Sequence, residues 1–593
     1  MNKHYRLHLF IFFALSFQLF LFAPVVFISR ILAVVLCAAV FLRRKRLGFA
    51  FMGKSGPLLF FLVNAYLTFA FFGFDLFFQA GDLRSASLLR LYYLGSGFLW
   101  TAYVLNALLG AVNDYQRRFP GAGSAPADGI LYWRKWLALS ALLFAVFTLW
   151  LLAYNPVVMS YDSWEYIAGW RGYLGGWRWQ EGSFLIGRSI PYVFLVSLIC
   201  RFAPSVPEVM WIAVAQNVAF SSILSTVLMY FHRKGIPFGF LLPFALFLPL
   251  IPSFGLHTVV VWCDLACGIS FLWLAYVSVR ILDEALTRDR IPKGQLRSLC
   301  VQLCLSLVLV CFARPNTFPV YLIAAPVLAL LFLLKKQWKL FAATALSAVL
   351  VLLIRFPGYR ALGAAEYEHL AEHRYFAAMH DMHAAYYGGG NFSERTLAAL
   401  KKYIPLIDDP STLNRFYPDW VVKDHYELGN LTTKEFLSMY IDSFVRNPVL
   451  MFKSMLYRSR IYWVVDPKAP INGVNYTDIY DPSTGSYLTQ APDIGVYRRT
   501  NALTGIMDRY CALMDKTLPA TFVWRLGVWT AVMVVCMAAL FSRGRRLFLL
   551  PYLPVFLYLA TLFITSGWTD YRYGLPVFFT GLFLPPACFL TGD

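Results

Sequence analysis

Long apolar runs separated by short polar segments are the dominant pattern of this chain. Runs of about 20 apolar residues are long enough to cross the hydrocarbon core of a bilayer as helices. The pattern predicts an α-helical polytopic membrane protein with about fourteen transmembrane helices. The predicted spans are 7–22, 25–42, 57–79, 88–112, 134–154, 208–231, 236–255, 257–281, 298–314, 316–334, 339–356, 522–541, 547–566 and 573–590.

Composition agrees with a membrane protein. Of 593 residues, 59% are hydrophobic and only 14% are charged, about half the charged fraction of a soluble domain. The formal net charge of +20 could suggest nucleic acid. However, the basic residues form short clusters between apolar runs, for example at 43–46, 117–118, 335–336 and 543–546. This placement is typical of cytoplasmic loops and argues against a nucleic-acid partner.

The positions of the basic clusters predict the topology. With a cytoplasmic amino terminus and alternating spans, every cluster falls on the cytoplasmic side, provided that 189–203 does not cross the membrane. We interpret this short apolar segment as an interfacial or re-entrant helix. Both termini are then cytoplasmic, and the loop 155–207 and the segment 357–521 are extracytoplasmic.

This topology divides the chain into five parts. They are an amino-terminal four-helix membrane extension (1–112), a cytoplasmic linker (113–133), a membrane core (134–356), a mixed, mostly helical extracytoplasmic domain (357–521) and carboxy-terminal membrane helices (522–593).

Two acidic residues in the first outer loop are candidate catalytic groups. Asp162 and Glu165 lie three positions apart and would share one face of a helix. A carboxylate beside the membrane surface could accept the proton of a hydroxyl acceptor. The alternative is an ordinary aspartate at a helix start.

Further polar residues are predicted at the same face of the membrane. His257 and Asp264 fall in the first two turns of the span 257–281 and on one face, and Asp264 has no cation nearby in sequence. Arg314, Asp570 and Arg572 lie at other outer helix ends, where an arginine could hold a phosphate. Helix capping, helix pairing and snorkelling are the structural alternatives.

Metal binding has little support in the sequence. The stretch His380-Asp381-Met382-His383 has suitable spacing, but no third ligand is identifiable. We therefore predict no specific metal ligands and no defined cofactor, and a divalent cation remains possible.

Several short motifs together resemble the GT-C superfamily of membrane glycosyltransferases, and within it an uncharacterised family of large bacterial polytopic proteins. The similarity covers residues 134 to 590. Its motifs are Tyr161-Asp162-Ser163-Trp164, Trp262-Cys263-Asp264, Ala313-Arg314-Pro315-Asn316, Tyr417-Pro418-Asp419, Val422-Lys423-Asp424, Phe444-Val445-Arg446-Asn447-Pro448 and Tyr571-Arg572-Tyr573-Gly574-Leu575-Pro576.

The resemblance implies a GT-C-like core and an inverting transferase with Asp162 as the base. The donor would be a polyprenyl-phosphate sugar, and the acceptor a surface glycan or a lipid. Arg314 or Arg572 would bind the leaving phosphate, and Asn316 belongs to the same motif as Arg314. Relatives often carry Trp-His-Pro where this chain has Ser-Ile-Pro at 189–191. If those groups bind donor or acceptor in the relatives, this protein would either use a different substrate or bind it with Arg188 instead.

Two other functions use the same features. A polysaccharide polymerase or ligase also acts on polyprenyl-linked glycans with outer arginines. A flippase or transporter would need charges at mid-depth of the membrane, whereas the charges here gather at one face.

Overall fold

The structure is a computed structural model, and it describes a set of separate ranges of the chain. These ranges are 56–73, 101, 129–155, 157–158, 163, 166, 173–175, 178–179, 184–186, 189–202, 209–286, 292–366, 370–409, 426–465, 480–481, 486–487, 501–514, 523–542, 544–565 and 571–590.

The described residues form a helical membrane protein. Seven of their helices are long and apolar enough to cross a membrane, or eight if a bent pair counts as one span. The seven are Leu131–Ala153, Met210–Arg233, Cys263–Glu284, Lys293–Ala313, Pro315–Leu334, Trp338–Ala361 and Arg546–Thr565.

The predicted number of fourteen spans is not reached within these ranges. The predicted spans 7–22 and 25–42 lie outside the described residues, 88–112 lies outside them except for Thr101, and 57–79 is described only as far as Gly73. The helices in 522–541 and 573–590 are α23 (Leu526–Ser542) and α25 (Leu575–Leu590), of 17 and 16 residues. At 1.5 Å per residue they are shorter than a typical span.

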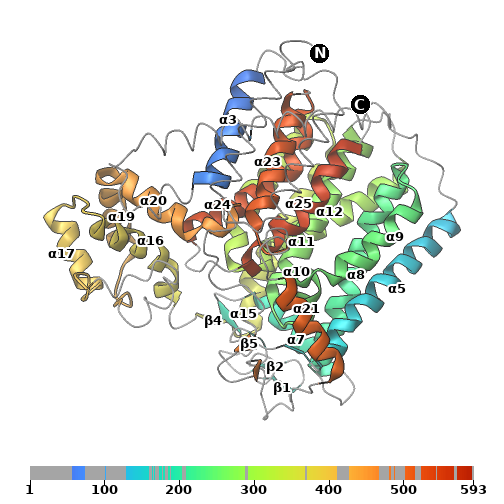
Figure 1. Ribbon diagram of the computed structural model, residues 1–593, viewed down its shortest axis with the longest axis horizontal. Coiled ribbons are helices and arrows are strands. Elements are labelled where there is room, and N and C mark those ends of the chain that lie inside the picture. The colour runs from blue at the N-terminus through green and yellow to red at the C-terminus, as the bar shows by residue number, and fades with distance from the viewer. Residues whose placement is uncertain are drawn as a thin grey trace.

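The membrane helices form a bundle around α11 (Figure 1). The bundle also contains α25 and six further helices, which are α5 (Gly129–Ala153), α8 (Met210–Arg233), α12 (Lys293–Ala313), α13 (Phe318–Leu334), α14 (Trp338–Leu353) and α24 (Leu553–Thr565). Helix α3 (Gly56–Thr68) continues into the short turn η1 (Phe69–Gly73). The other short helical turns of the bundle are η5 (Ile281–Leu286), η6 (Pro315–Thr317), η7 (Ile354–Gly358), η12 (Arg546–Tyr552) and η13 (Tyr571–Gly574).

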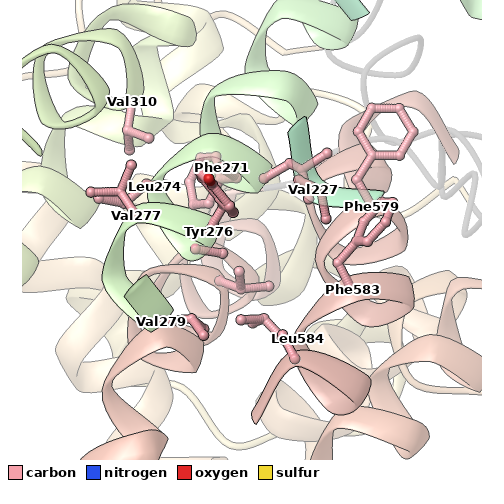
Figure 2. Close-up of a cluster of buried hydrophobic side chains, with 14 of the residues drawn as sticks. Val227, Phe271, Leu274, Tyr276, Val277, Val279, Val310, Phe579, Phe583 and Leu584 are labelled. Carbon is pink, nitrogen blue, oxygen red and sulfur yellow. The ribbon is translucent and has the colours of Figure 1, made fainter. Parts of the chain in front are cut away.

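Helix α11 (Cys263–Arg280) is the most enclosed of the spans, with 83% of its apolar window buried. Apolar side chains cover it on all sides, which is the pattern of a core helix. In Figure 2, Phe271, Leu274 and Val277 lie among residues of three neighbouring helices. Those neighbours include Val227 of α8, Val310 of α12, and Phe579 and Phe583 of α25.

The predicted spans 236–255 and 257–281 have different boundaries in the structure. The first is a pair of helical segments, Phe238–Leu250 and Pro252–Val259, bent by 71°. The pair comprises α9 (Phe238–Phe247), η3 (Leu248–Leu250), α10 (Pro252–Gly255) and η4 (Leu256–Val259). Prolines at 249 and 252 explain the break, because proline has no backbone N–H to continue a helix.

The segment 189–203 forms the separate short helix α7 (Ile190–Phe202). Its 13 residues span about 20 Å, less than the hydrocarbon thickness, which agrees with the prediction that it does not cross. Its start is attached to the end of α12, since the Ser189 hydroxyl donates to the Phe312 carbonyl at 2.7 Å.

The region 357–521 contains five helices of eight or more residues within its described part. They are α16 (Leu370–Tyr387), α17 (Glu394–Tyr403), α19 (Thr433–Arg446), α20 (Pro448–Arg458) and α21 (Ala502–Met514). Its shorter helical elements are α15 (Tyr359–Ala361) and η9 (Arg460–Tyr462). The first four long helices gather beside α24, whereas α21 packs near α5 and α7 (Figure 1).

Short strands pair in twos. Strands β1 (Tyr173–Gly175) and β2 (Arg178–Trp179) are antiparallel, as are β5 (Tyr480–Asp481) and β6 (Ser486–Tyr487). Strand β3 (Leu185–Ile186) of the first outer loop pairs in parallel with β4 (Ala365–Glu366).

One end of the bundle gathers basic residues from several helices. Lys135 of α5 hydrogen-bonds His232 of α8 at 2.9 Å, and Lys234 pairs with Asp283 at 2.5 Å. Nearby, Arg280 pairs with Glu284 at 2.8 Å. Gln295 of α12 also donates to Glu284. The starts of α5 and α12 and the ends of α8 and α11 therefore share this end, which we call the basic end. The shared end agrees with the alternating path predicted for these helices.

Candidate functional site

The end of the bundle opposite the basic end carries the described candidate residues. Three long helices begin there: α11 after Trp262, α13 after the turn η6, and α25 after the turn η13. The amino terminus of a helix carries partial positive charge and unpaired N–H groups. Three such termini at one end of the bundle favour anions there.

Asp264 and Arg314 form a direct ion pair in this region. Asp264 lies in the first turn of α11, and its side chain is only 2% exposed. Arg314 lies between α12 and α13 in extended backbone, and its side chain is 16% exposed. The sequence left Asp264 without a cation, and the tertiary structure supplies one from 50 positions further along the chain.

The ring of Tyr573 lies against two arginines. The guanidinium carbon of Arg314 is 4.1 Å from the ring centroid, and that of Arg572 is 5.0 Å from it. Arg572 also lies 4.7 Å from the centroid of the Trp262 ring. A guanidinium stacks favourably on an aromatic face.

Helix α24 holds Tyr573 in place. The hydroxyl of Tyr558, which is buried, donates to the Tyr573 backbone carbonyl at 2.8 Å. Thus α24 fixes the position of the ring on which both arginines stack.

We call Asp264, Arg314, Arg572 and Tyr573 the arginine cluster. Two of its side chains are guanidinium groups, and Asp264 pairs with one of them, Arg314. The Nε–H of Arg314 is a buried donor without a hydrogen-bond partner in the structure. Buried polar groups in proteins are usually paired, so this arrangement suits an anionic ligand with several oxygens, such as a phosphate.

His257 does not lie on the same helix as Asp264, contrary to the prediction. It belongs to η4, and extended residues 260–262 separate it from α11. The imidazole Nδ1 donates to the Ser253 carbonyl at 3.1 Å. The ring still lies near the cluster, with its centroid 5.8 Å from that of Trp262 and 6.1 Å from that of Tyr571.

The predicted first outer loop, 155–207, is attached to the start of α11. Val158 bridges Val260 in parallel, and the Ser163 hydroxyl donates to the Val261 carbonyl at 2.9 Å. The Tyr166 hydroxyl lies 3.1 Å from the Cys263 sulfur. The loop that contains the predicted catalytic residues therefore meets the helix that carries Asp264.

Four candidate residues lie outside the described residues. They are Asp162, Glu165, Arg188 and Asp570. Their predicted roles remain predictions.

The stretch 380–383 uses two of its polar side chains within the protein. Asp381 pairs with Arg458, and the two ring nitrogens of His383 face the Tyr426 hydroxyl at 2.9 Å and the Ile407 carbonyl at 3.3 Å. Across the described ranges, no three His, Cys, Asp or Glu side chains group as metal ligands.

Sequence reasoning missed the aromatic part of the cluster. Trp262 and Tyr573 stand beside charged residues within the quoted motifs, but alternating Tyr-Arg-Tyr does not indicate which ring receives which cation. Tyr558 lies in an apolar run and has no distinguishing signal.

No family model matches this chain, and neither a curated protein nor a solved structure matches it. The resemblance to GT-C transferases therefore rests on the short motifs alone.

Proposed function

We propose that this protein is an integral membrane glycosyltransferase. It transfers a sugar from a polyprenyl-phosphate donor to a surface glycan or lipid acceptor on the extracytoplasmic face. The proposal includes a GT-C-like core, about fourteen transmembrane spans, cytoplasmic termini and an extracytoplasmic domain formed by residues 357–521.

The observation that carries the proposal is the arginine cluster. Two guanidinium groups stack on one aromatic ring at the end of the bundle where three helices begin, and these positive groups together favour an anion there. A lipid phosphate becomes a more highly charged leaving group when the sugar departs. Cations placed beside it stabilise that developing charge.

Sidedness supports the same proposal. The cluster lies at the end of the bundle opposite the basic end, and cytoplasmic loops carry the excess of lysine and arginine. This supports a position of the cluster toward the outer leaflet, where a lipid-linked sugar is available and a nucleotide sugar is not.

In this mechanism Asp162 removes the proton of the acceptor hydroxyl as it attacks the anomeric carbon. The bond between the sugar and the phosphate breaks, and its electron pair leaves with the polyprenyl phosphate. One displacement inverts the anomeric configuration. Arg572 and Arg314 hold the departing phosphate, and Asp264 orients Arg314.

The test measures transfer from short-chain polyprenyl-phosphate hexoses by the full-length protein in lipid nanodiscs. Arg572→Gln is the informative variant, because Arg572 stacks on the rings of Tyr573 and Trp262 and is not the residue that pairs with Asp264. Losing one charge-assisted contact to phosphate, worth about 1.5–3 kcal/mol, is expected to weaken donor binding roughly 10- to 150-fold. Asp162→Asn is expected to abolish transfer while donor binding persists.

Arg233→Gln is the matched control. Arg233 also stacks on an aromatic ring, that of Tyr132, at 4.3 Å, but it lies at the basic end. Equal donor binding in wild type and Arg572→Gln would refute the phosphate role of the cluster. A wild type that binds lipid-linked glycan but transfers nothing from any donor would refute the transferase proposal itself.

A further inference from the structure

Helix α19 carries two apolar stripes, and only one of them is buried. Met439 packs into the core of the 357–521 region, and the partly buried Phe436 packs against that core. The second stripe consists of Leu437, Ile441, Phe444 and Val445, which are all exposed. Glu435, Asp442 and Arg446 lie further round the helix, and Lys434 lies beside the stripe in the first turn. A helix on the surface of a water-exposed domain needs only one apolar stripe, so the second stripe requires another explanation.

Helix α20 extends the exposed stripe. After the corner at Asn447 and Pro448, Val449 is 67% exposed and Phe452 is 49% exposed, and Val445 just before the corner is 73% exposed. We call Leu437, Ile441, Phe444, Val445, Val449 and Phe452 the α19–α20 apolar face. Contiguous exposed apolar side chains of this kind mark an interaction surface.

This face meets the end of a membrane helix. The ring centroid of Phe452 lies 5.8 Å from that of Phe563 on α24. Next to Phe563, the side chain of Ile564 is 55% exposed, so apolar surface continues from α20 onto α24. The segment Arg546–Thr565 is one of the helices long and apolar enough to cross the membrane.

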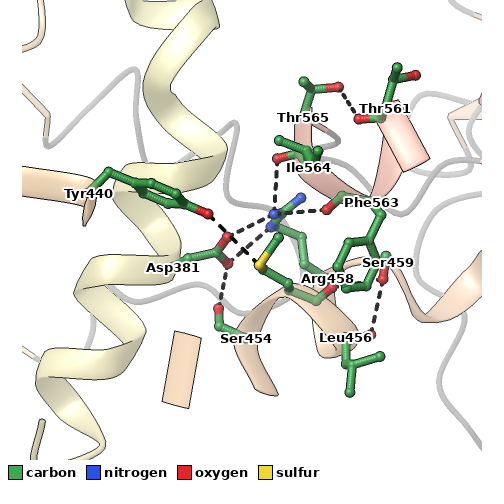
Figure 3. A network of polar contacts seen from close by, with 11 residues as sticks. Asp381, Tyr440, Ser454, Leu456, Arg458, Ser459, Thr561, Phe563, Ile564 and Thr565 are labelled. Atoms are coloured by element: carbon green, nitrogen blue, oxygen red, sulfur yellow. Dashed lines mark hydrogen bonds and ion pairs between the residues drawn. The ribbon is translucent and has the colours of Figure 1, made fainter. Parts of the chain in front are cut away.

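A buried polar network holds the two helices together (Figure 3). Arg458 of α20 pairs with Asp381 of α16 at 2.8 Å, and both side chains are 1% exposed. The same guanidinium donates to the Phe563 and Ile564 carbonyls of α24, each at 3.2 Å. The position of the α19–α20 apolar face relative to the membrane helix is therefore fixed.

We propose that the α19–α20 apolar face inserts into the lipid leaflet at the carboxyl end of α24. Its continuity with a membrane helix favours lipid over water, and its neighbouring cations favour lipid over a second protein copy. Lys434 and Lys453 lie beside the face, and long basic side chains in such positions can extend to the phosphate headgroups. This proposal does not depend on the glycosyltransferase function.

The test places a photoreactive benzoylphenylalanine at Val445 in the full-length protein. The protein is reconstituted in nanodiscs of phosphatidylcholine and phosphatidylglycerol, irradiated and analysed by peptide mass spectrometry for lipid adducts. The matched control carries the same group at Arg446, about 100° further round the helix. Ile441 provides a second test position on the face.

The proposal predicts lipid adducts at Val445 and Ile441 in at least about tenfold excess over those at Arg446, because only the apolar face reaches the acyl chains. Equal yields at all three positions would overturn it. Adducts joining two protein chains at Val445, with no lipid adduct, would also overturn it and would identify an interface between copies.

Discussion

The buried pair Asp381–Arg458 allows a quantitative prediction. The Asp381 carboxylate accepts bonds from Arg458 at 2.8 and 3.2 Å and from the Ser454 hydroxyl at 2.7 Å. Asp381→Asn keeps the shape of this side chain but removes its charge. The Arg458 guanidinium then stays buried beside a neutral amide instead of a carboxylate, and the backbone carbonyls of α24 do not supply the lost charge.

The size of the effect follows from burial. Both side chains are 1% exposed, so water cannot replace the lost carboxylate. Breaking one partner of a buried pair costs about 3–5 kcal/mol. At about 1.4 kcal/mol per factor of ten, local opening of α16 and α20 becomes roughly 100- to 4,000-fold more frequent.

Hydrogen–deuterium exchange of the full-length protein in nanodiscs measures this opening at the amides of α16 and α20. Arg446→Gln is the control, because the Arg446–Asp442 pair has similar geometry at 2.8 Å but its side chains are 44% and 26% exposed. That change is expected to alter exchange by less than about tenfold. The double variant Asp381→Leu with Arg458→Met, which removes both charges, is expected to open less often than Asp381→Asn alone. Unchanged exchange in Asp381→Asn would refute the argument.

Two further predictions concern the pH response of the 357–521 region and the bend in the membrane core. Burial lowers the pKa of His383 to about 4. Between about pH 4 and 6.5 the unfolded region therefore binds more protons than the folded region. The free energy of unfolding of the region falls by up to about 3 kcal/mol as the pH drops through that window. Exchange of α16 at pH 7 and pH 4.5 measures this loss, and an equal loss in His383→Gln would contradict the assignment. Gly255→Ala would drive a methyl group into the Trp150 ring, so we expect a loss of about 1–3 kcal/mol or more, measured as a lower thermal unfolding midpoint in nanodiscs. Gly239→Ala, where no atom lies within 4 Å of the new methyl, is the control and should leave the midpoint close to that of wild type.

The membrane class was readable from the sequence because hydrophobicity alone determines it. An apolar run as long as 134–154 is favourable in the hydrocarbon of a bilayer and unfavourable in water. Helix α5 covers nearly the same residues. The short helix α7 was predicted for the same reason, since its apolar run is too short to cross. The positions of the basic clusters predicted which helix ends lie together, and Lys135 and His232 do meet.

Local breaks were less predictable. The boundary between the bent pair and α11 was placed at 257, whereas α11 begins at Cys263. Apolar composition continues through residues 256–262, so hydrophobicity has no signal there. The extended conformation at Val260 comes from its pairing with Val158, which lies about 100 positions earlier.

The sequence by itself determined that the chain is a helical membrane protein and that charged residues cluster at helix ends, because both follow from local composition. Only the tertiary structure decided which charges meet. Arg314 pairs with Asp264, and Tyr573 receives both arginines, through the packing of α11, α12, α24 and α25. Such contacts depend on helix rotation and relative height across the whole bundle, and no local pattern of residues specifies these two quantities.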